Sequence, residues 1–206
     1  MNNEEQIFAE PMPDEPEKTK QSYNNILAYL RDFVSWLAGI LLVFMLLFRV
    51  VVVSGPSMLP TLQHGDCLIL LNGSLYGEPK QGDIIVIAPE DDSGGDPIIK
   101  RVIATEGQRV NIHFDAGIVL VDGVPLDEPY VNTPTNLDEG VQFPLTVEEG
   151  CIFVLGDNRN SSKDSRNPEI GQIDCRRVLG KALLLAFPGK DSETKKIDFG
   201  RIGVID

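Results

Sequence analysis

The sequence contains a serine in a sharp turn and a lysine in an apolar run, two residue types that can work together in catalysis. Ser57 lies in the turn-rich stretch VVVSGPSMLPTL, and Lys100 lies in the apolar run IIKRVIATEG. A neutral lysine amine can take the proton of a serine hydroxyl and so make the serine a nucleophile. The ordinary lysine pKa of about 10.4 must fall by roughly 2 to 3 for the neutral amine to be common near pH 8, and burial lowers it. Lys100 is therefore a candidate base if its strand is buried.

Alternation along this run predicts that Lys100 shares one strand face with Ile98 and Val102. Arg101 lies on the other face and cannot act as a base, because its guanidinium stays charged. The alternative is that Lys100 is a solvent-facing residue of an edge strand. The residue pattern leaves both open.

The chain has two histidines, and neither is placed as the usual partner of a catalytic serine. His64 lies in the predicted turn LQHGDC, and His113 alternates with apolar residues in VNIHFD. The chain has no HExxH, GxSxG, P-loop or GxGxxG motif. We therefore expect no metal and no cofactor.

The stretch GDNRNSSKDSR, residues 156–166, mixes acids, arginines and hydroxyls directly after the predicted strand CIFVL. Opposite charges in such a loop can pair and fix its backbone. An ordinary solvated turn is the alternative, and physical chemistry alone leaves the question open.

The elements that must position these residues are mainly strands. Short β-branched runs separated by turn signals predict a β domain over residues 50–190. Asp122-Gly123 between two such runs predicts a two-residue hairpin. Residues 191–206 are expected to be a peripheral C-terminal extension. The predicted strands contain CLILL, DIIVIAP, IIKRVIATEG, GIVLVDGVPL and CIFVLGDN.

The sequence pattern of the N-terminal residues predicts a disordered tail followed by a membrane anchor. Residues 1–25 are acidic and rich in proline, which predicts disorder. Residues 33–48 carry no charge, but as a helix they span about 24 Å, so flanking residues must help to cross a core of roughly 30 Å. We expect a transmembrane helix and its flanks over residues 26–49. A cleaved signal peptide and a buried core helix are the alternatives.

Basic residues set the expected orientation of this span. Lys18, Lys20 and Arg31 precede it and Arg49 follows it, which favours a cytoplasmic N-terminus and an extracytoplasmic domain. The formal net charge of −13 argues against nucleic-acid binding, which needs a basic surface.

The three cysteines, Cys67, Cys151 and Cys175, lack the close spacing of metal ligands. We expect free packing residues, with a bridge between Cys151 and Cys175 as the alternative.

Taken together, these stretches resemble the type I signal peptidases, the membrane-anchored branch of the Ser-Lys proteases. The likeness covers about residues 33–187 and follows a fixed order: an apolar span, then SGPSMLPTL, QGDIIVI, KRVIATEG, VDGVPLDEPYV, GDNRNSSKDSR and GKA. The resemblance implies a signal-peptidase-like β catalytic domain with a single N-terminal transmembrane helix.

The resemblance also implies roles for individual residues. Ser57 would be the nucleophile, Lys100 its general base, and Ser162 a hydroxyl that orients the lysine amine by a hydrogen bond. The Ser57 N–H would be one oxyanion donor. Some relatives have a hydroxyl as second donor at the position of Gly55, so this donor stays open. Structural support would come from Asp157, Asn158, Arg159, Asp164 and Arg166.

The substrates implied are secretory preproteins with small residues at −1 and −3, bound as an added strand. We expect Met58, Leu62 and Ile99 to line the shallow pockets. The lipid bilayer is the other expected partner, and the bacterial plasma membrane the expected location. The alternatives are another Ser-Lys processing peptidase of the same clan and an inactive membrane-anchored β scaffold. Among the former, a self-cleaving repressor would need an N-terminal DNA-binding helix pair, which the acidic tail lacks.

Overall fold

The structure is a computed structural model that describes residues 17–89, 95–191 and 194–205. The chain divides into two compact units, residues 1–44 and residues 45–206, which are described separately. The part of the expected disordered tail that comprises residues 1–16 lies outside the described residues.

Helix α1 (Glu17–Leu47) contains the apolar segment that was expected to span a membrane. Its stretch Ser22–Leu47 is long and apolar enough to cross a bilayer. Large apolar side chains are exposed along it, including Trp36 at 75% and Met45 at 74%. An exposed apolar helix of this length is compatible with membrane anchoring.

The bounds of α1 differ from the expected ones at both ends. The helix begins at Glu17, so the expectation of disorder is wrong for residues 17–25. These residues contain no proline, and extending an existing helix is far easier than nucleating one. The helix ends at Leu47, and Phe48 and Arg49 already belong to the first strand.

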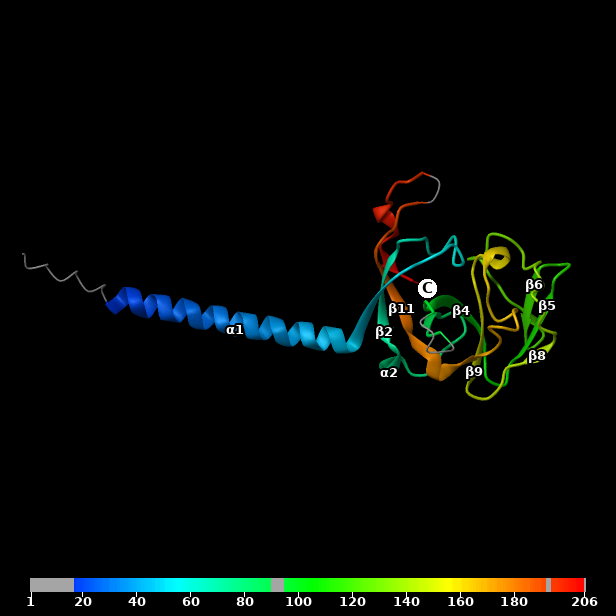
Figure 1. Cartoon of the computed structure of the whole chain (residues 1–206), viewed down its shortest axis with the longest axis horizontal. Coiled ribbons are helices and arrows are strands. Elements are labelled where there is room, and N and C mark those ends of the chain that lie inside the picture. Colours follow the sequence, from blue (N-terminus) through cyan, green and yellow to red (C-terminus); the bar gives the residue numbers. More distant parts are fainter. Residues whose placement is uncertain (1–16, 90–94, 192–193, 206) are drawn as a thin grey trace, which may run out of the picture. The chain divides into compact units, whose positions relative to one another are not determined.

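The second unit is mainly β, as predicted (Figure 1). Its larger sheet is antiparallel throughout. Its strand order is β1-β2-β11-β3-β4-β9-β10, and β12 pairs with β11. The bounds are β1 (Phe48–Val52), β2 (Cys67–Asn72), β3 (Ile84–Ile87), β4 (Ile98–Thr105), β9 (Cys151–Leu155), β10 (Ile173–Asp174), β11 (Val178–Phe187) and β12 (Gly203–Val204).

The smaller sheet has the order β7-β6-β5-β8. The predicted hairpin at Asp122-Gly123 is confirmed: it joins β6 to β7, and both turn residues have positive φ, 52° and 79°. The bounds are β5 (Arg109–His113), β6 (Ile118–Val121), β7 (Val124–Pro125) and β8 (Leu145–Thr146). The short helices are α2 (Gly73–Tyr76), η1 (Arg159–Ser161), η2 (Cys175–Arg177) and η3 (Phe199–Arg201).

Strand β4 lies inside the larger sheet, between β3 and β9. Its six central residues are buried, and its side chains contribute to clusters on both faces of the sheet. Ile103 and Phe153 pack with Val110 and Val119, which joins the two sheets in one apolar cluster. Lys100 is therefore carried by an inner strand, and the edge-strand alternative is wrong.

The C-terminal residues belong to the sheet more closely than a peripheral extension would. Strand β12 pairs with β11 through Val204 opposite Leu184 and Gly203 opposite Leu185. Ile205 packs against the core cluster that contains Met58. The three cysteines are free and half-buried, as expected.

Candidate active site

The turn that carries Ser57 follows β1 and is held by a distant loop. The Asn158 N–H donates to the Ser57 carbonyl at 3.0 Å, and the Asn158 side-chain amide donates to the Pro56 carbonyl at 3.1 Å. Gly55 has a φ of +90°, a conformation that suits glycine. The Ser57 N–H has no hydrogen-bond partner among the described residues, so it is free to meet an incoming carbonyl.

Lys100 reaches the Ser57 hydroxyl from β4. Its Nζ lies 3.0 Å from Ser57 Oγ and also donates to the Ile99 carbonyl at 3.1 Å. Lys100 is 3% exposed. Burial lowers its pKa below the ordinary lysine value, and the negative charges of Asp164, Asp157 and Glu139 partly oppose that shift. A hydroxyl and an amine at this separation can exchange a proton once the amine is neutral.

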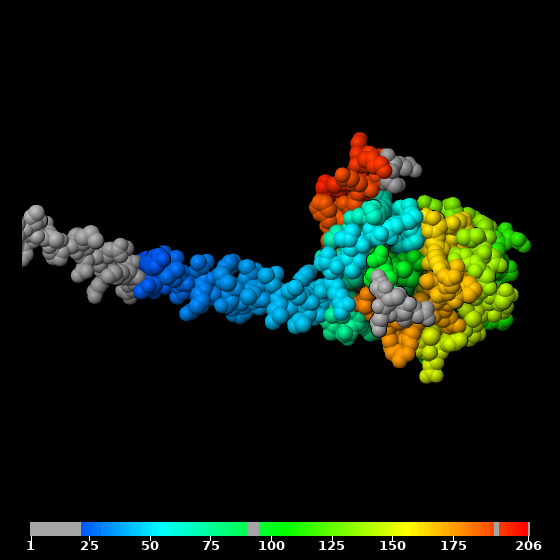
Figure 2. Space-filling model, in the orientation of Figure 1, coloured from blue at the N-terminus to red at the C-terminus, as the bar shows by residue number. Residues whose placement is uncertain are grey.

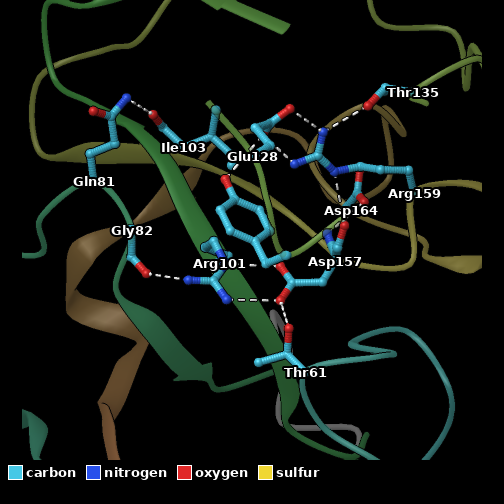
Figure 3. Close-up of polar contacts among 12 residues, drawn as sticks. Thr61, Gln81, Gly82, Arg101, Ile103, Glu128, Thr135, Asp157, Arg159 and Asp164 are labelled. Atoms are coloured by element: carbon cyan, nitrogen blue, oxygen red, sulfur yellow. Dashed lines mark hydrogen bonds and ion pairs between the residues drawn. The ribbon is translucent and has the colours of Figure 1, made fainter. Parts of the chain in front are cut away.

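The neighbouring Arg101 is paired with a carboxylate instead. Its guanidinium donates to both oxygens of Asp157, each at 2.9 Å, and both side chains are buried (Figure 3). Thr61 donates its hydroxyl to the same carboxylate at 2.5 Å. The ring of Tyr130 lies 3.9 Å from the guanidinium carbon. Asp157 thus ties the loop 156–166 to β4 and to the segment that follows Ser57.

Two further arginines hold the inside of the loop 156–166. Arg166 donates to Asp164 at 2.8 and 2.9 Å, and both side chains are fully buried. Arg159 pairs with Glu128 and donates to Thr135 at 2.7 Å (Figure 3). Each of the four buried charged side chains of this loop therefore forms an ion pair. In an ordinary solvated turn these side chains would be exposed, so that alternative is wrong.

Ser162 is brought to the site by this loop and is 6% exposed. Its Oγ has no hydrogen-bond partner among the described residues, so the expected bond to the lysine amine is not formed in this structure. A Cβ on Gly156 would lie 2.2 Å from Ser162 Oγ and 2.5 Å from the Ser57 carbonyl oxygen. Glycine at this position lets the loop and the Ser57 turn touch.

The three residues expected to line substrate pockets are core residues in this structure. Met58 and Leu62 are each 1% exposed and Ile99 is 7% exposed, and all three share one apolar cluster. Their contribution to a pocket stays a prediction.

Several residues of the site were not identified from the sequence. Thr61, Glu128, Tyr130 and Glu139 contact the charged groups around Lys100. His64 accepts the Gly55 N–H at its Nδ1, at 3.3 Å. Thr61 lies in the quoted stretch after Ser57, so its position was a usable signal. Glu128, Tyr130 and Glu139 lie in loops, and their partners are far away in the chain, so no local pattern indicated them.

A serine beside a buried lysine on a mainly β scaffold defines a candidate serine hydrolase, and the comparisons with known proteins name the family. The family model described as signal peptidase, peptidase S26, matches residues 26–187. A signal peptidase I of Bacillus licheniformis is 34% identical over 190 residues, 88% of this chain and 98% of that protein. A probable signal peptidase I-1 of Synechocystis sp. is 39% identical over 143 residues, 66% of this chain and 69% of that protein.

A crystal structure of a signal peptidase I from Enterococcus faecalis aligns with a TM-score of 0.41 and 31% identity, over 52% of this chain and 97% of that one. From the family match and the relatives, the chain belongs to the signal peptidase family, peptidase S26.

Proposed function

We propose that this chain is a membrane-anchored serine endopeptidase that removes N-terminal signal peptides from secretory preproteins, with Ser57 as nucleophile and Lys100 as general base. The observation that carries the proposal is the 3.0 Å approach of a buried lysine Nζ to a serine Oγ. Membership of the signal peptidase family supplies the substrate class.

The chemistry begins with neutral Lys100. The amine takes the Ser57 hydroxyl proton while Oγ attacks the carbonyl carbon of the scissile peptide bond. The resulting ammonium then gives its proton to the leaving amine as the C–N bond breaks, which leaves an acyl-enzyme. Water attacks that ester with Lys100 again as base, and the signal peptide leaves as a carboxylate.

The Ser57 N–H is the proposed first donor to the oxyanion of the tetrahedral intermediate, since it has no protein acceptor among the described residues. The Gly55 N–H is engaged by His64 at 3.3 Å, and glycine has no side chain to offer. A second donor at this position must therefore come from a rearranged turn or from another group.

Ser162 is proposed to orient the lysine amine when substrate is bound. The ion pairs of Asp157, Asp164, Arg159 and Arg166, together with the two bonds from Asn158, are proposed to keep Ser162 and the Ser57 turn in place. These residues support geometry, so their loss is expected to disturb the fold before the chemistry.

A cleavage region with small residues at −1 and −3 is proposed to bind in an extended form. Strand β1 ends the order of the larger sheet, so one of its edges is unpaired in the described fold. Such an edge can take an added strand through main-chain hydrogen bonds. Met58, Leu62 and Ile99 are proposed as the floor of the pockets that exclude large side chains.

The proposed location is the bacterial plasma membrane. Helix α1 is proposed to cross it once, with the N-terminus in the cytoplasm and the β domain outside, in contact with the lipid bilayer. Support comes from the apolar stretch Ser22–Leu47, and from the basic residues Lys18, Lys20 and Arg31 before the uncharged residues 33–48 against Arg49 after them.

The experiment compares the full-length chain with Ser57→Ala in detergent, using a precursor that carries an Ala-x-Ala cleavage site. Wild type is expected to release the signal peptide at that site, and Ser57→Ala to release none. Ser54→Ala is the matched control, because Ser54 is exposed nearby and is expected to keep full activity. Cleavage by Ser57→Ala contradicts the mechanism. An intact precursor after incubation with folded wild type contradicts the function and favours an inactive scaffold.

A further inference from the structure

A buried carboxylate behind the Ser57 turn joins three segments of the chain. Asp66 is fully buried, just before β2. It accepts the Gln63 N–H at 2.8 Å and the Gly189 N–H at 2.7 Å. A buried carboxylate with these neutral donors still needs a cation, because an unpaired charge in the interior is costly.

Arg201 of η3 supplies that cation from the C-terminal segment. Its guanidinium donates to both oxygens of Asp66, at 3.0 and 2.7 Å. The same guanidinium donates to the Thr61 carbonyl at 3.2 Å. Its side chain is 20% exposed. A planar guanidinium can bind a carboxylate through two parallel bonds and contact a carbonyl as well, which a lysine ammonium cannot match.

The contact at Thr61 connects Arg201 to the candidate active site. The Thr61 hydroxyl donates to Asp157, the partner of Arg101. The segment from Ser57 to Asp66 is therefore held on one side by Asp157 and Asn158 and on the other by Arg201. Figure 2 shows the C-terminal residues, orange to red, against the cyan surface that contains this segment.

The C-terminal segment does not depend on Arg201 alone for its position. Strand β12 pairs with β11, and the Ile205 N–H donates to the Leu183 carbonyl at 3.1 Å. Ile205 also packs against the core cluster of Met58 and Leu62. Removing the guanidinium should therefore loosen the Ser57–Asp66 segment on the Arg201 side while the C-terminal strand stays paired.

We propose that Arg201 is a positioning residue for signal-peptide cleavage: by binding Asp66 and the Thr61 carbonyl, it fixes the segment that presents Ser57 to Lys100. The inference rests on the proposed function for its effect on rate, and on the contacts alone for its effect on the segment. It gives residues 194–205 a part in the reaction that a peripheral extension would not have.

The test compares Arg201→Met and Arg201→Lys with wild type in the full-length chain, by steady-state cleavage of the Ala-x-Ala precursor. For Arg201→Met we expect kcat to fall about ten-fold to one hundred-fold with KM within about two-fold, because small misplacement of a reacting group slows the chemical step. Arg201→Lys should recover only part of kcat, and added guanidinium ion should raise the rate of Arg201→Met and not of wild type.

Two control variants separate positioning from general loss of stability. Ile205→Ala weakens the same segment but keeps the guanidinium, and Arg176→Met removes an arginine whose side chain is 90% exposed. Both should keep kcat within about two-fold. If Arg201→Met loses no more kcat than Ile205→Ala at the same loss of Tm, the positioning role is overturned.

Hydrogen exchange gives a readout that does not need activity. Arg201→Met should speed exchange of the Gln63 and Asn158 amides, which donate to Asp66 and to the Ser57 carbonyl, and leave β3 and β4 unchanged. Wild-type exchange at both amides overturns the proposal even if no precursor is cleaved. If wild type does not cleave the precursor but hydrogen exchange is faster in Arg201→Met, the proposed function is overturned. The role of Arg201 in fixing the Ser57–Asp66 segment is then still supported.

Discussion

Lys100 and Arg101 are neighbours on one buried strand, and the protein treats their charges in opposite ways. Arg101 is paired with Asp157 through two hydrogen bonds of 2.9 Å. Among the described residues Lys100 forms no ion pair, and its amine contacts the Ser57 hydroxyl and the Ile99 carbonyl. One charge is permanent and matched by a partner, whereas the other can be removed by losing a proton. A folded strand thus keeps a reactive amine beside a structural guanidinium.

The difference lies in what burial costs each group. A guanidinium stays charged in proteins, so its burial requires a counter-charge. A lysine can become neutral by losing a proton, and burial accordingly lowers the pKa of Lys100. The carboxylates near it, Asp164, Asp157 and Glu139, are bound to arginines and favour the charged form of Lys100 from a distance.

The largest expected effect comes from replacing Lys100. Lys100→Met should lower kcat by at least about 10³-fold, since the general base is gone. The same variant should be more stable than wild type at pH 7, because folding lowers the pKa of Lys100 and so costs free energy at a pH where the unfolded lysine is protonated. Cleavage assays and urea unfolding measure the two effects.

The sign of that stability change follows from proton linkage. Because the folded-state pKa of Lys100 is lowered, the unfolded chain binds its proton at a higher pH than the folded chain does. Above the pKa of lysine in the unfolded chain, this pKa difference does not destabilise the folded protein. As the pH falls from that value toward the folded-state pKa of Lys100, the destabilisation of the folded protein grows. A stability gain in Lys100→Met that is the same at pH 11 and at pH 7 would contradict a lowered pKa. Lys100→Arg is the control that keeps a charge, and it should be inactive and destabilised.

The next effect comes from the Arg101 side of the strand. Asp157→Asn removes the carboxylate that accepts two hydrogen bonds from the buried Arg101 guanidinium, and it should destabilise the protein by about 3–5 kcal/mol. Thermal unfolding measures the loss. A double variant, Asp157→Asn with Arg101→Met, should regain part of that stability, because both members of the buried pair are then neutral. If the double variant is less stable than the single one by the full cost of Arg101→Met, the two residues are not coupled.

The smallest expected effect is a shift in the pH dependence of kcat when Glu139 is replaced. Glu139→Gln removes a negative charge that favours the ammonium form of Lys100, so the pKa of Lys100 should fall further. The acid limb of kcat should move to lower pH by less than about 1. Glu169→Gln is the matched control, because Glu169 is exposed and pairs with the exposed Lys163. A limb that moves to higher pH, or moves equally in both variants, contradicts the assignment.

Local pattern was enough to predict five of the strand regions, the Asp122-Gly123 hairpin and the apolar helix, but it did not identify β11 (Val178–Phe187). Residue chemistry made Lys100 a candidate base, and the resemblance to a known family pointed to Ser57. The burial of Lys100 could not be predicted locally, because it depends on β3 and β9 pairing with β4 from either side. The Asp66–Arg201 ion pair could not be predicted for the same reason: nothing near either residue in the chain indicates its partner. Both the burial of Lys100 and the Asp66–Arg201 ion pair depend on contacts between residues far apart in the chain, which local sequence patterns do not contain.

Helix α1 runs into β1 without an intervening loop, and Ser57 follows soon after. The chain between Leu47 and Ser57 can extend at most about 35 Å, even when fully stretched. Where α1 spans a bilayer as proposed, Ser57 is confined to a thin layer beside that surface. A precursor anchored by its own signal peptide lies in the same layer, so the two meet by lateral diffusion at a raised effective concentration. With α1 in the bilayer as proposed, the short tether selects substrates by where they are held, before any side chain is recognised.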